Sequence, residues 1–438
     1  MGYWWHEMNN NIKYLPLGSV AFSEKGKKPK ETVREKKTGY LPYIDIKAFE
    51  RGVFENYTDG EGCNFCFEGD LLMVWDGSRF GLAGKAYKGA IGSTLVKINV
   101  PQCNQDFVYY FLKSKYLIIN SRPKGTGTPH VNPDLLWNFE FPIMSIKEQE
   151  KAVELIEQLF SDLDNAIDNL KKAKDQIEVY RHATFKYAFD GKLTNLKAKE
   201  FFECKLKDIT DVGTGATPKR GVKKYYENGS IPWVTSSCVN ETLVMFSKEK
   251  ITQVAINETN CKIFPRGSLI IAMYGEGKTR GKISELGIDT ATNQACAVLV
   301  LKQDSKVIKE YVKAFLKNQY GAMRMRASGG VQPNLNLGII KNWTIRAPKD
   351  SKDQHDIMDT VNLRLSVCDK MEETINNSLE QSAALRHSIL KQAFEGKLTE
   401  EWRKHNTELI SGKNSAKALL ERIQKEREVL KNTKKRKK

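Results

Sequence analysis

The chain has 438 residues, which is too long for one ordinary core and predicts two or three domains. It carries 70 Lys and Arg against 53 Asp and Glu, a formal net charge of +17, and 40% of its residues are hydrophobic. These values exclude a mini-protein and a disordered chain, and the positive charge favours a polyanionic partner such as nucleic acid.

No run approaches the roughly 18 apolar residues that a membrane span needs. The N-terminal residues match neither a secretion signal nor a myristoylation site, so we expect a cytoplasmic protein without membrane contact. The eight cysteines are scattered, which fits reduced thiols better than a disulfide framework.

The predicted elements alternate between two kinds of region. Residues 1–145 predict an α+β domain, because short β-rich runs such as 43–46, 71–75 and 95–98 lie between Gly- and Pro-rich turns. Residues 146–195 predict a long helix, 196–350 a second α+β domain, 351–400 a second long helix, and 401–438 a basic C-terminal helix and tail.

An internal repeat underlies this order. Residues 181–194 and 386–399 share Arg-His, Lys, Ala-Phe and Gly-Lys-Leu-Thr at an offset of 205 residues, and Lys-Glu-Gln at 147–149 matches Lys-Asp-Gln at 352–354. Further upstream the similarity weakens but keeps its order. Each half therefore consists of a variable unit followed by a strongly similar helix, which predicts a pseudo-two-fold internal repeat.

The two helices carry narrow apolar seams with charged residues between them. In the first, Lys174 interrupts the seam, and in the second Glu372 and Ser382 do so. A single helix cannot bury its own stripe, so we expect the two copies to pair as an antiparallel coiled coil, with Gly191 and Gly396 ending them. Two separate helices, each packed on its own domain, are the alternative. The seam residues include Leu163, Ile167, Leu170, Leu365, Ile375 and Leu379.

No catalytic constellation is found in the sequence. Residues 275–279 resemble part of a phosphate loop, but Ala272 stands where its first glycine belongs, and residues 132–135 lack the second proline and the aromatic of an adenine methyltransferase motif. Cys63 and Cys66 have thiolate-pair spacing, but no second pair lies near them, so we expect no metal site and two core-facing thiols. We therefore expect no catalytic residue.

Two basic, Gly-rich loops are the candidate DNA-binding sites. Each follows an apolar strand at a corresponding place in the repeat, and each can bring donors close to phosphates or guanine edges. Secondary candidates are residues 45–47, 235–237, 124–128 and 324–330, and an ordinary solvated basic hairpin is the alternative for any one loop. The candidate DNA-binding residues are Ser78, Arg79 and Lys85 in the first loop and Tyr274, Lys278, Thr279, Arg280 and Lys282 in the second.

This order of units resembles the specificity subunit of type I restriction-modification systems. The resemblance covers essentially the whole chain and is strongest over Ala-Phe-Glu-Gly-Lys-Leu-Thr at 393–399, which continues into Trp402-Arg403 and residues 409–412 and 418–421. It implies that each variable unit is a target recognition domain that reads one half of a bipartite, asymmetric site in double-stranded DNA. The helices would set the spacer between the half-sites.

The resemblance also implies partners in a prokaryotic cytoplasm. Two modification subunits would dock along the helices, at the six seam residues named above, and would bring S-adenosylmethionine for adenine N6 methylation. Two restriction subunits, in a system that has them, would add ATP- and magnesium-dependent translocation and cleavage. This chain itself would bind no cofactor.

Two other classes of protein remain as alternatives. A nucleic-acid-binding scaffold without a methyltransferase partner would bind specifically alone, and a fused enzyme would bind S-adenosylmethionine itself. The base that each side chain reads, and the spacer length, do not follow from the sequence.

Overall fold

The computed structural model describes residues 12–125, 127–194, 196–239, 242–274, 279–323 and 335–436, with side chains up to Val429. The chain divides into two compact units, Met1–Leu170 with Asn377–Lys438 and Lys171–Asn376. Each unit contains one α+β domain and part of each of two long helices.

Domain 1, in the first unit, has a main sheet of strand order β2-β9-β6-β7 and a second sheet of order β4-β3-β8-β5. Strands β3 and β8 are parallel, while the other neighbours in these sheets are antiparallel. A separate antiparallel pair, β1 with β10, closes the domain beside the long helices. The elements are β1 (Lys13–Pro16), α1 (Leu17–Val20), β2 (Phe22–Lys25), β3 (Leu41–Ile44), α2 (Ile46–Arg51), β4 (Tyr57–Thr58), β5 (Phe65–Cys66), β6 (Leu71–Val74), β7 (Ala83–Lys85), β8 (Gly89–Ile91), β9 (Leu95–Asn99), α3 (Gln105–Asn120), α4 (Pro133–Trp137) and β10 (Glu140–Ile143).

Domain 2 repeats this topology in the second unit. Its main sheet has order β12-β20-β17-β18-β14 and its second sheet β15-β13-β19-β16, with β13 parallel to β19 as β3 is to β8. The elements are β11 (Phe201–Lys205), α6 (Leu206–Ile209), β12 (Thr210–Thr214), β13 (Ile231–Val234), β14 (Leu243–Val244), β15 (Glu249–Ile251), α7 (Gln253–Glu258), β16 (Ile263–Phe264), β17 (Leu269–Ala272), β18 (Ile283–Leu286), β19 (Thr290–Thr292), β20 (Cys296–Leu301), α8 (Lys309–Asn318), α10 (Leu337–Lys341) and β21 (Thr344–Pro348), with short 3-10 turns at Ala198–Glu200, Lys223–Tyr225 and Ser236–Cys238.

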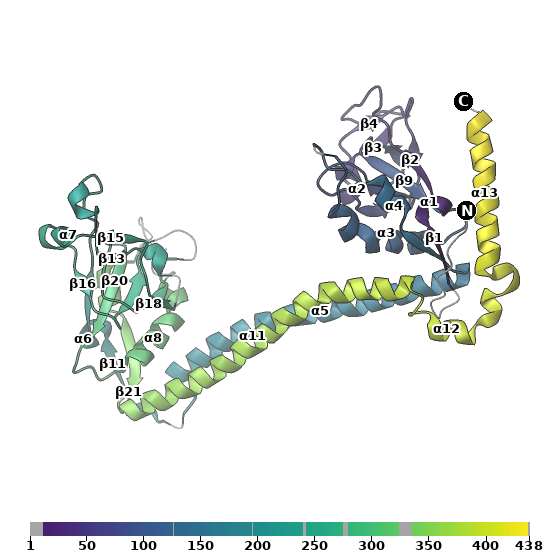
Figure 1. Ribbon diagram of the computed structural model, residues 1–438. Coiled ribbons are helices and arrows are strands. Elements are labelled where there is room, and N and C mark those ends of the chain that lie inside the picture. The colour runs from purple at the N-terminus through teal and green to yellow at the C-terminus, as the bar shows by residue number, and fades with distance from the viewer. Residues whose placement is uncertain are drawn as a thin grey trace. The chain divides into compact units, whose positions relative to one another are not determined.

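The two long helices, α5 (Ile146–Phe189) and α11 (Ser351–Phe394), have 44 residues each (Figure 1). They pair antiparallel, as predicted. In the second unit, Arg181 contacts Asp369 at 2.6 Å and Lys174 contacts Glu372 at 3.5 Å, and in the first unit Arg386 pairs with Asp164. The charged residues that interrupt the two seams, Lys174 and Glu372, are therefore each other's partners.

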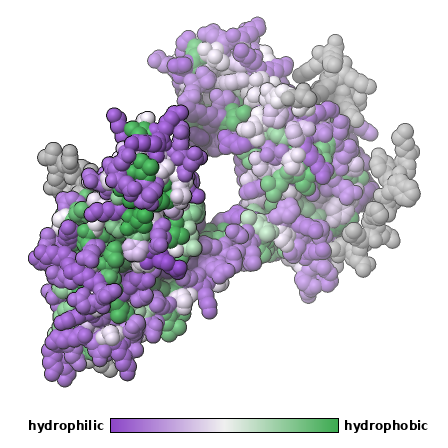
Figure 2. Space-filling view, turned by 60° about the vertical axis from the view of Figure 1, so that its left-hand side comes forward, coloured by the Kyte–Doolittle hydropathy of each residue, from purple (hydrophilic) through white to green (hydrophobic). Residues whose placement is uncertain are grey.

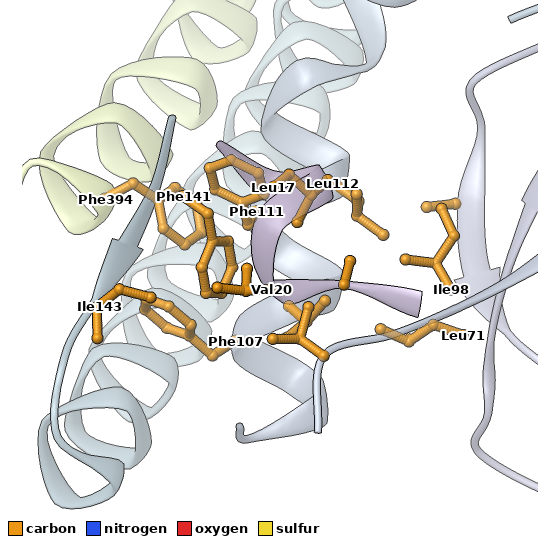
Figure 3. Packing of buried hydrophobic residues seen from close by; sticks show 14 of the residues in the cluster. Leu17, Val20, Leu71, Ile98, Phe107, Phe111, Leu112, Phe141, Ile143 and Phe394 are labelled. Atoms are coloured by element: carbon orange, nitrogen blue, oxygen red, sulfur yellow. The ribbon is translucent and has the colours of Figure 1, made fainter. Parts of the chain in front are cut away.

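The C-terminal end of each long helix packs into an α+β domain, α11 into domain 1 and α5 into domain 2. Phe394 at the end of α11 meets the rings of Phe107 and Phe111 in domain 1, with centroids 5.2 and 5.4 Å away (Figure 3). Phe189 at the end of α5 meets Tyr311 and Phe315 in domain 2 at 5.1 and 5.4 Å. The repeated Ala-Phe motif thus inserts the same aromatic anchor into each core.

Glycines end both helices at matching places. Gly191 has φ +75° and Gly396 has φ +70°, a left-handed conformation that other residues rarely adopt. This confirms their predicted role as helix terminators.

The repeated glutamine near the start of each long helix binds the N-terminus of a helix in the adjoining domain, α3 in domain 1 and α8 in domain 2. The Gln149 carboxamide accepts from the Asn104 backbone N–H at 2.8 Å and donates to the Met144 carbonyl at 2.9 Å. Gln354 accepts from the Ile308 N–H at 2.8 Å and donates to the Pro348 carbonyl at 2.8 Å. Both glutamines are buried, so the repeated motif fixes α3 and α8 at their N-termini.

The C-terminal segment packs on domain 1. Helices α12 (Glu400–His405) and α13 (Ala416–Arg436) are joined by 3-10 turns at Thr407–Ile410 and Gly412–Asn414. Leu419, Leu420 and Ile423 of α13 are buried in the domain 1 core. Among the described residues, no helix is both long and apolar enough to span a membrane.

Candidate nucleic-acid interface

Several loops emerge at one end of the main sheet in each domain. In domain 1, Lys25 at the end of β2 pairs with Val96, and Val74 at the end of β6 pairs with Leu95. In domain 2, Thr214 and Ala272 end their strands against Ala297 and Cys296. The loops after β2 and β6, and those after β12 and β17, therefore leave the sheet side by side.

The first candidate loop connects β6 to β7 at this end. It carries Ser78, whose carbonyl accepts from the Asn120 side chain at 3.2 Å, and Arg79, which forms an ion pair with Glu50. Residues 129–131 lie against it, because Asp76 forms an isolated bridge with His130 and the Gly77 N–H donates to the Pro129 carbonyl, and Lys124 of the predicted segment 124–128 bridges the same His130. The structure thus brings two of the predicted segments of domain 1 together.

Lys85 does not join this group. It pairs with Leu71 at the beginning of β6, at the other end of the strand, and its ammonium lies 2.5 Å from Asp106 of α3. The matching position in domain 2 is Glu285, opposite Leu269, and it binds Lys309 and Lys313 of α8 at 2.7 Å each. The same strand-to-helix ion pair thus occurs in both domains with its charges reversed, which indicates a structural role for Lys85.

The second candidate loop connects β17 to β18. Tyr274 is 37% exposed at its beginning, and Thr279, Arg280 and Lys282 are partly buried on its returning side. The Gly281 N–H donates to the Ala272 carbonyl, which places these residues at the same end of the sheet as the loop after β12. Lys278 and the secondary candidate 324–330 lie outside the described residues.

Two secondary candidates have local structural roles. The Asp45 carboxylate accepts from the Ala48 N–H at 2.8 Å and caps α2. Thr235 contacts the Ser237 hydroxyl at 2.9 Å just after β13. Both nevertheless lie beside the candidate loops, because the Ile44 and Val234 carbonyls accept from Gly92 and Asn293 in the connections that precede β9 and β20.

A further loop at this end was not among the predicted sites. It begins with Gly26-Lys27-Lys28-Pro29-Lys30 after β2 and with Gly215-Ala216-Thr217-Pro218-Lys219 after β12. A Cβ on either glycine would lie 2.0 Å or less from a carbonyl oxygen, of Gly92 in domain 1 and of Thr292 in domain 2. The repeated Gly-x-x-Pro-Lys spacing is a signal in the sequence that could have identified this loop.

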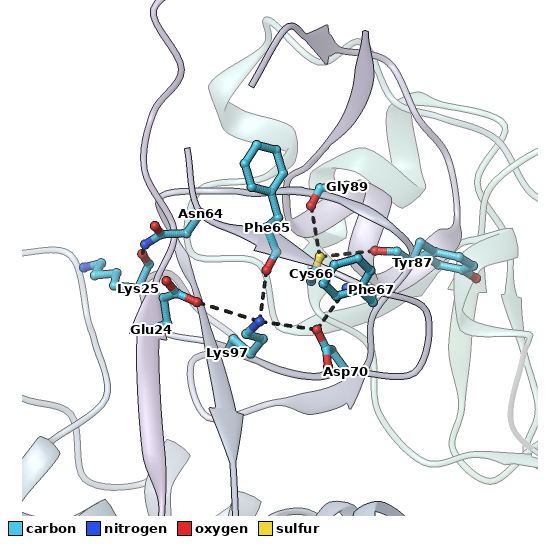
Figure 4. A network of polar contacts seen from close by, with 10 residues as sticks. All are labelled: Glu24, Lys25, Asn64, Phe65, Cys66, Phe67, Asp70, Tyr87, Gly89 and Lys97. Atoms are coloured by element: carbon cyan, nitrogen blue, oxygen red, sulfur yellow. Dashed lines mark hydrogen bonds and ion pairs between the residues drawn. The ribbon is translucent and has the colours of Figure 1, made fainter. Parts of the chain in front are cut away.

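A polar network fixes β2, the strand that leads into this loop in domain 1, to its neighbours (Figure 4). The Lys97 ammonium donates to the Phe65 carbonyl at 3.0 Å and lies 3.4 Å from Asp70 and 3.7 Å from Glu24, and the Asn64 amide donates to the Lys25 carbonyl. The strand that leads into the loop is therefore fixed to its neighbours.

The two predicted thiols lie beside this network. The Cys66 thiol is buried, contacts the Tyr87 carbonyl at 3.2 Å, and burial raises its pKa to about 11, while Cys63 is partly exposed. In the part of the chain that the structure describes, no group of His, Cys, Asp and Glu has the arrangement of a metal site.

The six seam residues predicted for partner docking lie on the paired helices. Ile375 is buried, and the other five, Leu163, Ile167, Leu170, Leu365 and Leu379, are partly buried. Other apolar side chains of the second unit point to solvent, at Val179 (67% exposed), Tyr180 (47%), Tyr187 (50%), Leu363 (67%), Val367 (50%) and Met371 (50%).

Four of these exposed side chains gather on one flank of the helix pair. Arg181 and Asp369 pair on one flank, so helical spacing places Tyr180, Tyr187, Val367 and Met371 on the opposite flank. Hydrophilic residues cover most of the face drawn in Figure 2, with hydrophobic residues between them. An exposed apolar flank of this kind is typical of an interaction surface.

The chain has two α+β domains of the same topology. Each has basic loops at one end of its main sheet and packs on the antiparallel helix pair, an arrangement that indicates a two-domain nucleic-acid-binding protein. The protein-family model "Type I restriction modification DNA specificity domain" matches residues 9–179 and 198–381 of this chain. The chain belongs to this family of type I restriction-modification specificity subunits, which bind DNA and are not catalytic.

Curated relatives agree with this assignment, and solved structures share the fold. The chain is 24% identical to the MjaVIII specificity subunit of Methanocaldococcus jannaschii, over 85% of this chain and 90% of that protein, and 25% identical to the EcoBI specificity subunit of Escherichia coli, over 94% and 92%. The fold matches the HsdS subunit from Thermoanaerobacter tengcongensis with a TM-score of 0.62 and 14% identity, covering 90% of this chain and 98% of that one. It also matches, with a TM-score of 0.64, 15% identity and coverage of 90% and 100%, a chain from a study of complex assembly and conformational transition of the type I R-M system.

Proposed function

We propose that domains 1 and 2 each read one half of a bipartite, asymmetric DNA site, and that the helix pair sets the spacer and docks two modification subunits. The observation that carries this proposal is the duplication, because the same loops recur at the same sheet end in both domains. The modification subunits would supply S-adenosylmethionine chemistry, and restriction subunits, in a system that has them, ATP- and magnesium-dependent cleavage.

The first test is co-expression of this chain with the neighbouring modification gene of its genome, followed by mapping of N6-methyladenine by long-read sequencing. We expect one split motif with a fixed spacer. A soluble complex that adds no methylation would instead favour a nucleic-acid-binding scaffold without a methyltransferase partner.

The spacer is tested by lengthening both helices together. Because α5 and α11 pair antiparallel, seven residues inserted after Leu170 need a matching seven before Asn377 to keep the pairing. Seven helical residues rise about 10.5 Å, which corresponds to at most about three base pairs of roughly 3.4 Å. The mapped motif should keep both half-sites and gain a longer spacer, and altered half-sites would contradict the proposal.

For the modification subunits, we propose the exposed apolar flank of Tyr180, Tyr187, Val367 and Met371 as a docking surface. The seam residues are largely occupied by the pairing of α5 with α11, whereas these four side chains remain exposed. An amphipathic helix of the modification subunit would bury them as in a helix bundle.

Substitution of one residue on each helix tests this surface. The double variant Tyr180→Glu, Met371→Glu should lose modification subunits during co-purification, measured by size exclusion with light scattering. The variant Leu117→Glu, a 67% exposed apolar residue of α3, is the control and should keep the wild-type stoichiometry. Equal stoichiometry for all three proteins would exclude this flank.

A further inference from the structure

The loops after the first main-sheet strand have no assigned role. We propose that residues 26–37 and 215–224 form a matched pair of clamps that bind the DNA phosphate backbone beside each half-site. This inference rests on the proposed reading of DNA by both domains, and it assigns these loops to positioning rather than to base recognition.

Charge is the first argument. Residues 26–37 contain six Lys and Arg against two Glu, and residues 215–224 contain four Lys and Arg and no acid. All ten basic side chains are exposed. Lysine and arginine at this density neutralise phosphates without reading sequence.

Existing ion pairs leave these cations available. Among the described residues, Lys28, Arg34, Lys36 and Lys219 form no ion pair. Lys223 and Lys224 pair with Glu227 and Glu258, but their side chains are 84% and 55% exposed. Exposed pairs of this kind contribute little to stability, so phosphate can replace the carboxylate at little cost.

Rigidity is the second argument. Pro29 and Pro218 are buried at equivalent places, and the preceding Gly26 and Gly215 pass so close to the chain that no side chain fits. In domain 2 the Arg220 guanidinium also lies 5.0 Å from the Trp233 ring and 5.3 Å from the Tyr226 ring. A loop that is already ordered loses little conformational entropy when it binds.

Position is the third argument. The loop after β2 leaves the sheet beside the β6–β7 hairpin, and Lys25 and Asp76 connect the two at 3.2 Å. In domain 2 the loop after β12 lies beside the end of β17, because β12 and β17 both end against the start of β20. A clamp next to the reading hairpin would fix the register of the domain on the duplex.

The test uses the complete complex with its modification subunits. In the domain 1 variant, Lys27, Lys28 and Arg34 are each replaced by Gln, and in the domain 2 variant Lys219, Lys223 and Lys224 are replaced by Gln. The control replaces Lys413, Lys417 and Lys425 by Gln, which removes the same charge from exposed positions of the C-terminal segment. DNA affinity is measured by fluorescence anisotropy from 0.05 to 0.3 M salt, and the methylated motif is mapped for every variant.

Each clamp variant should lower the slope of log affinity against log salt by about 2–3 and weaken binding on the order of a hundredfold near 0.15 M salt. The methylated motif should stay the same, and the control should bind like the wild type. A slope equal to that of the control, or a changed motif, would overturn the clamp while leaving half-site reading intact. A wild-type complex that neither binds nor methylates DNA would overturn the proposed function itself.

Discussion

The interaction of Glu148 with Arg403 allows a quantitative prediction for the C-terminal segment. The Arg403 guanidinium lies 3.3 Å from the Glu148 carboxylate, and the two side chains are only 15% and 5% exposed. The Thr399 hydroxyl donates to the same carboxylate at 2.9 Å, and Arg403 also donates to the Gly396 carbonyl at 2.6 Å. Helix α12 is thereby connected to the start of α5.

We predict that Arg403→Met destabilises the first unit by about 3–5 kcal/mol, because it leaves a buried carboxylate without its cation. Two unit charges at 3.3 Å attract each other by roughly 5 kcal/mol at an effective dielectric constant of 20, which is consistent with this range. The double variant Arg403→Met, Glu148→Gln should recover much of the loss, because no charge then remains buried.

The assay is hydrogen exchange measured by mass spectrometry on the full chain, because a chain of two units does not unfold in one step. Peptides around Glu148 and Arg403 should exchange on the order of 10²- to 10³-fold faster in Arg403→Met. Peptides at the start of α11, in the second unit, serve as the internal reference. A loss below about 1 kcal/mol, or a double variant as unstable as the single one, would refute the reasoning.

The pH dependence follows from the same pair. Burial raises the pKa of Glu148, against the opposing effects of Arg403 and Thr399. Without Arg403 the pKa should rise further. A raised carboxyl pKa means that the folded state disfavours the charged form, so the penalty is present above the folded pKa and disappears below the unfolded value. The stability lost in Arg403→Met should therefore return as the pH falls from 7 toward 4.

Further predictions concern one unit at a time. Gln149→Ala should destabilise the first unit and Gln354→Ala the second, each by about 1–3 kcal/mol, because the backbone N–H of the N-cap residue of α3 or α8 loses its acceptor. Hydrogen exchange of α3 and α8 measures the two effects separately. Burial alone would raise the pKa of Glu285, but the hydrogen bonds from Lys309 and Lys313 hold this pKa below its usual range. The contribution of Glu285 to stability is therefore present at neutral pH and lost as the pH falls through the folded pKa. The stability difference between wild type and Glu285→Gln in thermal unfolding should thus be largest near pH 7, decrease once the pH falls below the unfolded value of about 4.3, and disappear below the folded pKa.

The repeat made much of the architecture predictable. The recurring seams predicted the antiparallel pairing, and the two charged interruptions, Lys174 and Glu372, contact each other. Seam periodicity could not reveal that Leu419 and Ile423 of the C-terminal helix are buried in domain 1, because a helix with an amphipathic pattern does not specify the surface that covers it. The structural role of Lys85 could not be predicted either, because the sequence around a basic residue does not show whether its side chain contacts a phosphate or, as here, Asp106.

The reversed ion pair of the two domains limits how they can be recombined. Lys85 faces Asp106 in domain 1, whereas Glu285 faces Lys309 and Lys313 in domain 2. A chimera that exchanges whole domains keeps each pair together. A crossover between strand and helix would instead oppose two cations or two anions across the same contact. Exchange between the two copies therefore has to move the strand and the helix of this contact together.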